Sequence, residues 1–182
     1  MVFGSALQIV MSLGPSNFKI VRGMLQGDLL DFLGYYAYDK ANSPEAVQQG
    51  ERDHLRSNAV PNTPSLYDDP STRYLLHYFL HDMKEYSGAD LEPTYSYLRV
   101  YKNGNVLHRH TDRAECEYSV SLTLKREHED EIWPLYLQTD QIYQALLEEG
   151  DGLIYKGIEN AHWRESFKGE RLAQVFLHYV KR

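Results

Sequence analysis

The sequence predicts a mainly antiparallel β-sheet protein, a sandwich or barrel, with supporting helices in its N-terminal half. Three stretches rich in aromatic and β-branched residues, at 94–101, 118–124 and 172–180, are typical of strands, and the shorter 152–155 is a fourth candidate. Short strands separated by turn signals favour antiparallel sheets over a parallel one. The chain of 182 residues is long enough for one domain with a sizeable core.

The N-terminal half, residues 1–93, is expected to be mostly helical support and loop. A short strand at 18–21 leads into a helix at about 28–37. Pro44 and the polar stretch 48–53 then indicate a turn-rich continuation.

A loop rich in Asn, Pro and Ser follows at 57–69, and it either covers the mouth of a site or is a plain connection. The next helix has clear end signals, with Asp69 as its N-cap, Pro70 in its first turn and Gly88 as its stop. One face of this helix is apolar and should pack on the outer side of the sheet; it comprises Leu75, Phe79, Met83 and Tyr86.

Residues 94–182 should form the sheet core, with three less regular segments. The charge run 125–131 indicates a solvated loop. Residues 133–137 indicate an edge strand, because Pro134 cannot donate a hydrogen bond to a neighbouring strand. The stretch 139–147 is expected to be a short helix.

Two imidazoles and one carboxylate form a candidate metal site: His110, Asp112 and the distant His162. On a strand, side chains at i and i+2 share a face, so His110 and Asp112 can meet one ion. Two His and one carboxylate are the ligands that hold Fe(II) while leaving coordination positions open. A second His-x-Asp pair, at 128 and 130, lies in the charge run, where no metal role is expected.

The order and spacing of several short motifs resemble a known family. These motifs are Tyr101-x-x-Gly104, His110-x-Asp112, Gly152-Leu-Ile-Tyr-x-Gly157, His162 and Arg171. In this order they are similar to those of the 2-oxoglutarate- and Fe(II)-dependent dioxygenases, and most similar to the prolyl-4-hydroxylase-like branch. The resemblance covers about residues 94–180. It implies one dioxygenase domain over 1–182, with a double-stranded β-helix (jelly roll) at 94–182 and the N-terminal helices on its outer sheet.

The resemblance also implies roles for single residues. His110, Asp112 and His162 match the iron ligands and catalytic centre. Arg171 matches the residue that pairs with the distal carboxylate of 2-oxoglutarate, which a planar guanidinium can bind through two hydrogen bonds. Tyr101 matches a tyrosine that lines the cosubstrate pocket.

One position departs from the family pattern. Many members carry Ser or Thr two residues after the cosubstrate arginine, and this chain has Ala173 there. The additional hydrogen bond must come from elsewhere, and Thr123 on the strand after the His-x-Asp turn is a candidate donor.

The activity implied is hydroxylation of an unactivated C–H bond in an amino acid or peptidyl residue such as proline. Fe(II), 2-oxoglutarate and O2 are required, succinate and CO2 are released, and ascorbate is an optional reductant. Asp112 occupies a position where a halogenase relative has a small residue, so hydroxylation is the default. The alternative is a non-catalytic metal-binding jelly roll, namely a sensor or storage protein. Arg171 discriminates between the two functions, because a site that only binds metal needs no residue to hold a dicarboxylate.

Composition narrows the partners to a small molecule or a peptide, while the oligomeric state stays open. The net charge of −7 argues against a nucleic-acid binder, and Leu177 stands where a nucleobase-demethylating relative has a second arginine. The single Cys116 excludes an internal disulfide framework and suits a reducing compartment. No signal peptide or membrane span is evident in the sequence, so a cytoplasmic location is expected and no membrane partner.

Overall fold

The computed structural model describes residues 17–57, 60, 63–127 and 132–182. The helices are α1 (Gly27–Lys40), α2 (Pro44–Ser57), α3 (Pro70–Tyr78), α4 (Leu80–Ser87) and the short 3-10 turn η1 (Ala114–Cys116). The strands are β1 (Phe18–Val21), β2 (Ser65–Tyr67), β3 (Leu91–Lys102), β4 (Leu107–His110), β5 (Tyr118–Glu127), β6 (Leu135–Gln138), β7 (Ile142–Ala145), β8 (Gly152–Tyr155), β9 (His162–Arg164) and β10 (Arg171–Lys181). Among the described residues, no helix is long and apolar enough to cross a membrane.

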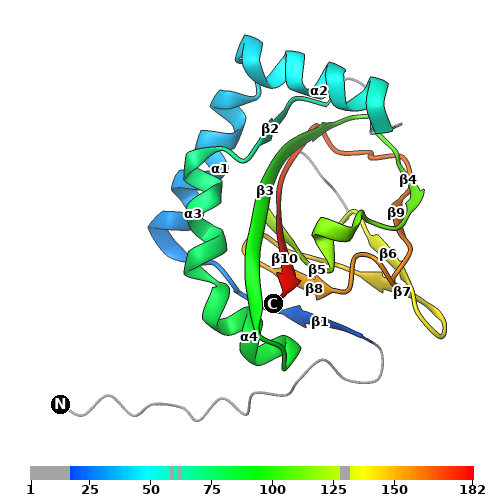
Figure 1. The fold of residues 1–182 in the computed structure, drawn as a ribbon. Coiled ribbons are helices and arrows are strands. Elements are labelled where there is room, and N and C mark those ends of the chain that lie inside the picture. Colours follow the sequence, from blue (N-terminus) through cyan, green and yellow to red (C-terminus); the bar gives the residue numbers. More distant parts are fainter. Residues whose placement is uncertain (1–16, 58–59, 61–62, 128–131) are drawn as a thin grey trace.

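The strands form two antiparallel sheets that face each other (Figure 1). The major sheet has the order β1-β8-β5-β10-β3-β2, and the minor sheet has the order β4-β9-β6-β7. From β3 onward the chain passes back and forth between the two sheets, with β6 and β7 forming a hairpin in the minor sheet, which is the arrangement of a jelly roll. The predicted fold class, mainly β with supporting helices, is confirmed.

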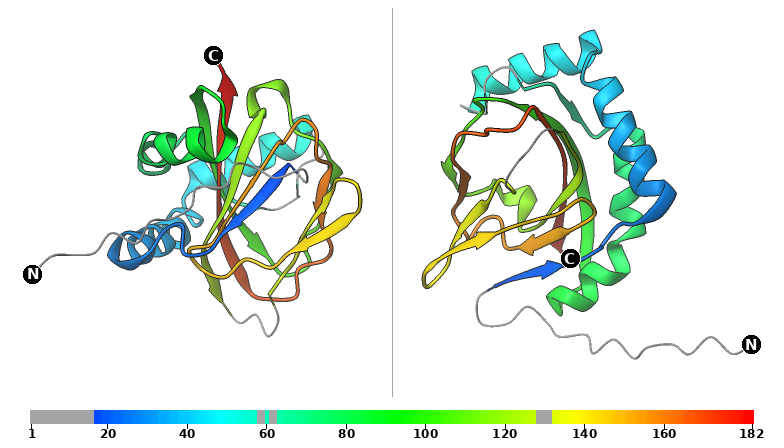
Figure 2. Two further views of the ribbon diagram at one scale, coloured as in Figure 1. Left: turned by 90° about the horizontal axis from the view of Figure 1, so that it is seen from below. Right: turned by 180° about the vertical axis from the view of Figure 1, so that it is seen from behind.

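The major sheet separates two cores, because alternate residues of each strand point to opposite faces. On β10, Ala173, Val175 and Leu177 join the core beneath the helices, whereas Leu172 joins the core between the sheets. The helices cover only the outer face of the major sheet, as the view from behind in Figure 2 shows. The predicted packing of N-terminal helices on the outer sheet is therefore correct, and the inner face is left for a site.

Helices α3 and α4 confirm the predicted end signals. The Asp69 side chain accepts a hydrogen bond from the Ser71 N–H at 3.0 Å, and Gly88 ends α4 in the left-handed region with φ 67°. The sequence predicted one continuous helix, but the structure breaks it at Phe79, where φ is −93° and ψ is 0°. The apolar face survives the break because backbone hydrogen bonds still join Phe79 to Leu75 and Met83 to Phe79.

Helix α2 corrects the prediction of a turn-rich segment after Pro44. The Ser43 hydroxyl accepts a hydrogen bond from the Ala46 N–H at 3.2 Å, and Pro44 occupies the first helical position, where its missing N–H costs nothing. A Cβ on Gly50 would lie 2.1 Å from the carbonyl oxygen of Thr63, so this glycine lets the helix approach the following segment closely. The residues of 44–53 that suggested turns thus mark the start of a helix, at Pro44, and a close packing contact, at Gly50.

Strand β7 corrects the prediction of a helix at 139–147. It pairs with β6 in register, from Leu135 opposite Ala145 to Gln138 opposite Ile142. Tertiary pairing overrides the local helical propensity here. Strand β6 confirms the strand predicted at 133–137, but it lies between β9 and β7 rather than at an edge, and Pro134 stands just before it.

Two further expectations concern the loops. The segment expected at 57–69 contains the short strand β2, which pairs with β3; residues 58, 59, 61 and 62 lie outside the described residues, so its role as a cover is not decided. Strand β5 extends into the charge run as far as Glu127. The second His-x-Asp pair, at 128 and 130, also lies outside the described residues.

Candidate functional site

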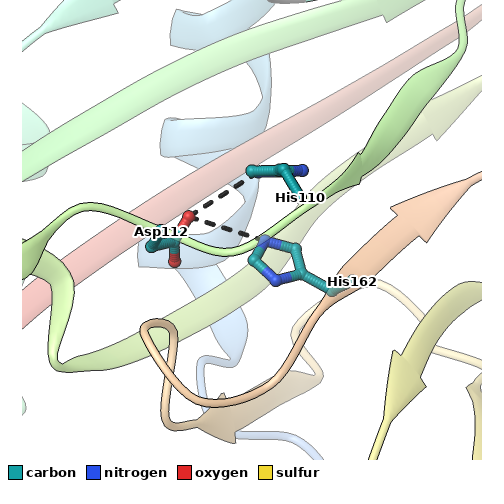
Figure 3. A group of neighbouring side chains, drawn as sticks. All are labelled: His110, Asp112 and His162. Carbon is teal, nitrogen blue, oxygen red and sulfur yellow. Dashed lines mark ion pairs between the residues drawn. The ribbon is translucent and has the colours of Figure 1, made fainter.

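The three predicted ligands converge at one end of the space between the sheets (Figure 3). His110 ends β4 and lies directly across from His162 on β9. Asp112 follows β4, and its N–H donates to the carbonyl oxygen of Gly157 at 2.9 Å. The Asp112 Oδ1 lies 3.7 Å from the Nε2 of His110 and 3.6 Å from the Nε2 of His162. Ligand atoms of all three residues lie within 4.8 Å of one another, so they could hold a single metal ion.

The backbone orients both imidazoles toward Asp112. The Nδ1 of His110 lies 2.7 Å from the carbonyl oxygen of His108, and the Nδ1 of His162 lies 3.0 Å from that of Asn160. A carbonyl oxygen only accepts, so each Nδ1 carries the proton and each Nε2 has a free lone pair for a metal. Burial lowers the pKa of His162, although Asp112 opposes the shift. A neutral imidazole is the form that binds metal.

Gly157 is required for the position of Asp112. A Cβ at this residue would lie 2.3 Å from the Asp112 Oδ2, 2.5 Å from the Cys116 carbonyl oxygen and 2.9 Å from the Ser119 Oγ. The Cys116 carbonyl is backbone and cannot give way easily, so an added Cβ would push against the Asp112 carboxylate and the Ser119 hydroxyl. The glycine found in the sequence motif thus has a steric reason.

Replacing Gly157 by Ala is therefore expected to displace the Asp112 carboxylate. We expect a metal affinity reduced about 10-fold or more and a loss of about 1–3 kcal/mol in the free energy of unfolding. Isothermal titration with Mn(II) and denaturant unfolding measure the two effects. Gly104→Ala is the matched control, because φ is 84° at Gly104 and nothing lies within 4 Å of its Cβ position. It should lower stability through backbone strain and leave metal affinity unchanged; equal metal affinities in the two variants would contradict the steric argument.

The inner face of the major sheet is polar at its centre. Thr123 on β5, Gln174 on β10 and Arg99 on β3 are register partners on three neighbouring strands. All three side chains are buried, and the Thr123 Oγ1 lies 3.4 Å from the Gln174 Oε1. Thr123 thus lies in the interior with its hydroxyl within reach of Gln174, and its contact with the cosubstrate stays a prediction.

Tyr101 is also in the interior and is fully buried, at 0% exposure. Its ring packs edge-on against Trp133, with 5.0 Å between the ring centroids. Among the described residues, its hydroxyl has no hydrogen-bond partner. A buried phenol without a partner is costly, and it fits a pocket that a polar ligand completes.

Arg171 lies on the face of the major sheet that the helices cover, so its predicted contact with the cosubstrate stays a prediction. It is the first residue of β10 and shares a face with Ala173, on the side covered by the helices. Its guanidinium stacks on the Tyr38 ring of α1 at 4.3 Å and forms an ion pair with Glu127 at 2.5 Å. The spacing from His162 is that of the family motif, but strand parity turns the side chain to the opposite face.

Arg99 instead places a cation in the interior, at 8% exposure. Its Nη2 donates to the Tyr97 hydroxyl at 3.2 Å, and its guanidinium lies over the rings of Tyr97 and Tyr101 at 5.0 and 5.7 Å. In the described part of the chain, the Arg99 Nε has no hydrogen-bond partner and no ion pair joins Arg99 to a carboxylate. A buried guanidinium stays charged and is costly without an anion, so this end of the interior fits a carboxylate.

Tyr155 is a buried phenol beside the three candidate ligands. Its hydroxyl lies 3.5 Å from the His162 Nε2. Burial raises the pKa of Tyr155 well above its usual range, and Asp112, Cys116 and Tyr101 raise it further.

Sequence reasoning missed two residues beside Asp112, namely Ser119 and His178. The Ser119 Oγ donates to the Asp112 Oδ2 at 3.2 Å and lies 2.9 Å from the His178 Nδ1. The stretch Ser119-Val-Ser-Leu-Thr123 carried a usable signal, because hydroxyl residues at every second position of an apolar strand indicate a polar inner face.

No family model matches the sequence, and no curated protein matches it. The fold of the chain, in contrast, is similar to the folds of solved structures. The chain has the fold of the prolyl-4-hydroxylase-like 2-oxoglutarate- and Fe(II)-dependent oxygenases.

Three solved structures illustrate the similarity. A prolyl-4-hydroxylase from Pseudomonas putida has a TM-score of 0.71 and 14% sequence identity, with 96% of this chain and 97% of that chain covered. A Trichoplax adhaerens prolyl hydroxylase in complex with a peptide of hypoxia inducible factor has a TM-score of 0.74 and 14% identity, with 94% and 87% covered. A non-heme alpha-ketoglutarate-dependent epimerase from nogalamycin biosynthesis has a TM-score of 0.74 and 12% identity, with 95% and 82% covered.

Proposed function

We propose that this protein is an Fe(II)- and 2-oxoglutarate-dependent dioxygenase that hydroxylates an unactivated C–H bond. The single observation that carries the proposal is the convergence of His110, Asp112 and His162 in the interior of a jelly roll of this class. Two neutral imidazoles and one carboxylate suit Fe(II) and occupy only part of its coordination sphere. The bound iron and cosubstrate supply the oxidising chemistry, in which O2 and 2-oxoglutarate are consumed, succinate and CO2 leave, and one oxygen atom enters the substrate.

The chain's own residues bind, orient and exclude water. His162 is 4% exposed and Asp112 14%, whereas His110 is 40% exposed, so the site is closed on the sheet side and open toward His110. We assign the substrate approach to this open side. The buried ligands hold the metal where solvent is excluded, and this is the environment in which electrostatic interactions are strongest.

We assign the distal carboxylate of 2-oxoglutarate to Arg99, in place of Arg171. Arg99 supplies a buried guanidinium with an unpartnered Nε, and Tyr101 supplies an unpartnered hydroxyl beside it. Charge-assisted hydrogen bonds to a carboxylate would satisfy both groups. Thr123 is on the same row of the sheet and is the candidate for an additional hydrogen bond.

The primary substrate is proposed only as a class, namely an amino acid, free or within a peptide. A peptide-bound prolyl hydroxylase among the similar structures supports this class, and prolyl residues are the first substrates to screen. An epimerase with the same fold shows that the fold admits other outcomes. The second candidate function is the non-catalytic metal-binding protein, which the three ligands alone would also permit.

Anaerobic titration of the Fe(II)-loaded protein with 2-oxoglutarate tests the proposal. We expect a weak visible metal-to-ligand charge-transfer band, because the cosubstrate's 2-oxo acid group would chelate the iron at the open positions. Zn(II)-loaded protein is the control, since it binds the same ligands without such a band. Iron binding without any band would favour the sensor or storage protein.

A further inference from the structure

The second oxygen of Asp112 is held by a polar pair that the proposed function does not use. Ser119 is fully buried on β5, and His178, 6% exposed, is its register partner on β10. The Ser119 Oγ lies 3.2 Å from the Asp112 Oδ2 and 2.9 Å from the His178 Nδ1. Asp112 thus directs Oδ1 toward the two histidines and Oδ2 toward Ser119.

The protons in this chain can be assigned from chemistry. A serine hydroxyl has one proton, and a hydrogen bond to a carboxylate is about twice as strong as one to a neutral acceptor. Ser119 therefore donates to Asp112, and the Nδ1–H of His178 donates to Ser119. Burial lowers the pKa of His178 to about 4, although Asp112 opposes the shift, so the imidazole is neutral.

A β-bulge in the neighbouring strand β3 lies opposite His178, whereas β10 pairs with β5 in regular register here. Between the pairs Leu177–Ser96 and Tyr179–Pro93, the strands β10 and β3 lose register, so two residues of β3 face the single His178. One of them, Thr94, donates through its Oγ1 to the His178 carbonyl oxygen at 3.0 Å.

The second bulge residue, Tyr95, holds the imidazole ring. It packs against His178 with 4.7 Å between ring centroids. The Tyr95 hydroxyl is in turn held by Arg113 at 2.9 Å and lies 3.0 Å from the Cys116 Sγ. The bulge thus brings Tyr95 of β3 against the imidazole, while the register of β10 with β5 sets His178 beside Ser119.

We propose that Ser119 and His178 are positioning residues that tie the Asp112 Oδ2 and leave only Oδ1 for the metal. A carboxylate bound through one oxygen occupies one coordination position, whereas one bound through both occupies two. The pair thereby keeps a position open that the proposed oxygenase reaction requires. The inference rests on the proposed function, since it needs a metal at His110, Asp112 and His162.

The same region offers a competing reading. Ligand atoms of Asp112, Cys116 and His178 also lie within 4.8 Å of one another, so these residues could hold a second ion. Burial raises the pKa of the Cys116 thiol to about 11, which disfavours the thiolate that would bind a metal. The Ser119 hydroxyl already joins Asp112 to His178, and Tyr95 packs on His178 while its hydroxyl lies 3.0 Å from the Cys116 Sγ, so we assign these groups to positioning.

The test is a comparison of Ser119→Ala with Ser121→Ala. Ser121 is the matched control, because it is a buried hydroxyl on the same strand and face that accepts from the Gln174 Nε2 at 2.9 Å. We expect Ser119→Ala to weaken Co(II) and Fe(II) affinity about 10- to 100-fold and to change the visible Co(II) spectrum, which reports coordination number. Ser121→Ala should leave both unchanged. Equal behaviour of the two variants in both measurements would overturn the proposal.

Two further variants separate positioning from simple support of the fold. His178→Asn keeps an N–H donor near the position of Nδ1 and should retain the wild-type Co(II) spectrum, whereas His178→Leu should match Ser119→Ala. A changed spectrum in His178→Asn with an unaltered unfolding midpoint would count against the assignment. Binding of a second equivalent of Co(II) that Cys116→Ser abolishes would also overturn it, in favour of the second metal site. Failure of the wild-type protein to bind any metal would instead refute the proposed function, which keeps the two failures distinct.

Discussion

Replacing Asp112 by Ala is expected to abolish turnover and to reduce Fe(II) affinity about 100-fold or more. Asp112 is the only carboxylate of the His110–Asp112–His162 group, and its Oδ1 lies within 3.7 Å of both imidazoles. Two histidines alone bind a divalent ion weakly. Without the carboxylate, less of the positive charge of the bound metal is neutralised. Coupled assays of succinate formation and titration calorimetry with Fe(II) under argon measure the two losses.

The control for this variant is Thr111→Ala. Thr111 is exposed and lies between the two ligands in the sequence, so the substitution perturbs the same backbone without removing a ligand. It should keep turnover and metal affinity within about twofold of wild type. Hydroxylation retained by Asp112→Ala would show that the metal is held by other residues.

Replacing Arg99 by Met is expected to raise the dissociation constant for 2-oxoglutarate about 100-fold while leaving metal affinity unchanged. Two charge-assisted hydrogen bonds to a carboxylate, at about 1.5 kcal/mol each, correspond to this factor. Arg171→Met is the matched control, because Arg171 is an arginine of a neighbouring strand that faces the helices and pairs with Glu127. It should bind 2-oxoglutarate nearly as wild type does.

A cosubstrate analogue makes this experiment sharper. 2-Oxopentanoate has the 2-oxo acid group of 2-oxoglutarate but no distal carboxylate, so its affinity should be the same in wild type and Arg99→Met. Retained binding of the analogue would also demonstrate that the variant is folded. The opposite pattern, with Arg171→Met losing 2-oxoglutarate and Arg99→Met keeping it, would restore the assignment made from the sequence.

The convergence of His110, Asp112 and His162 was predictable because their relation is local or is marked by turns. His110 and Asp112 share a face through two-residue spacing alone, and Gly157 marks the turn that brings His162 across. The strands at 94–101, 118–124, 152–155 and 172–180 were predictable from their alternating composition, and all four lie within strands of the major sheet. The helix after Pro44 and the strand at 142–145 were not predictable in this way, because packing and pairing decided them against local signals.

The sequence read along the chain thus determined the positions of the main strands, the jelly-roll fold class and the three candidate ligands. Three features came only from the tertiary structure. Parity at the start of β10 turns Arg171 to the helices. Register across three strands brings Arg99 into the interior, and the register of β10 with β5 sets His178 beside Ser119. The physical reason is that strand side chains alternate with a period of two, so a shift of one residue in a loop or bulge moves a side chain to the other face. Such a shift leaves the sequence spacing of a motif intact and changes what the motif can bind.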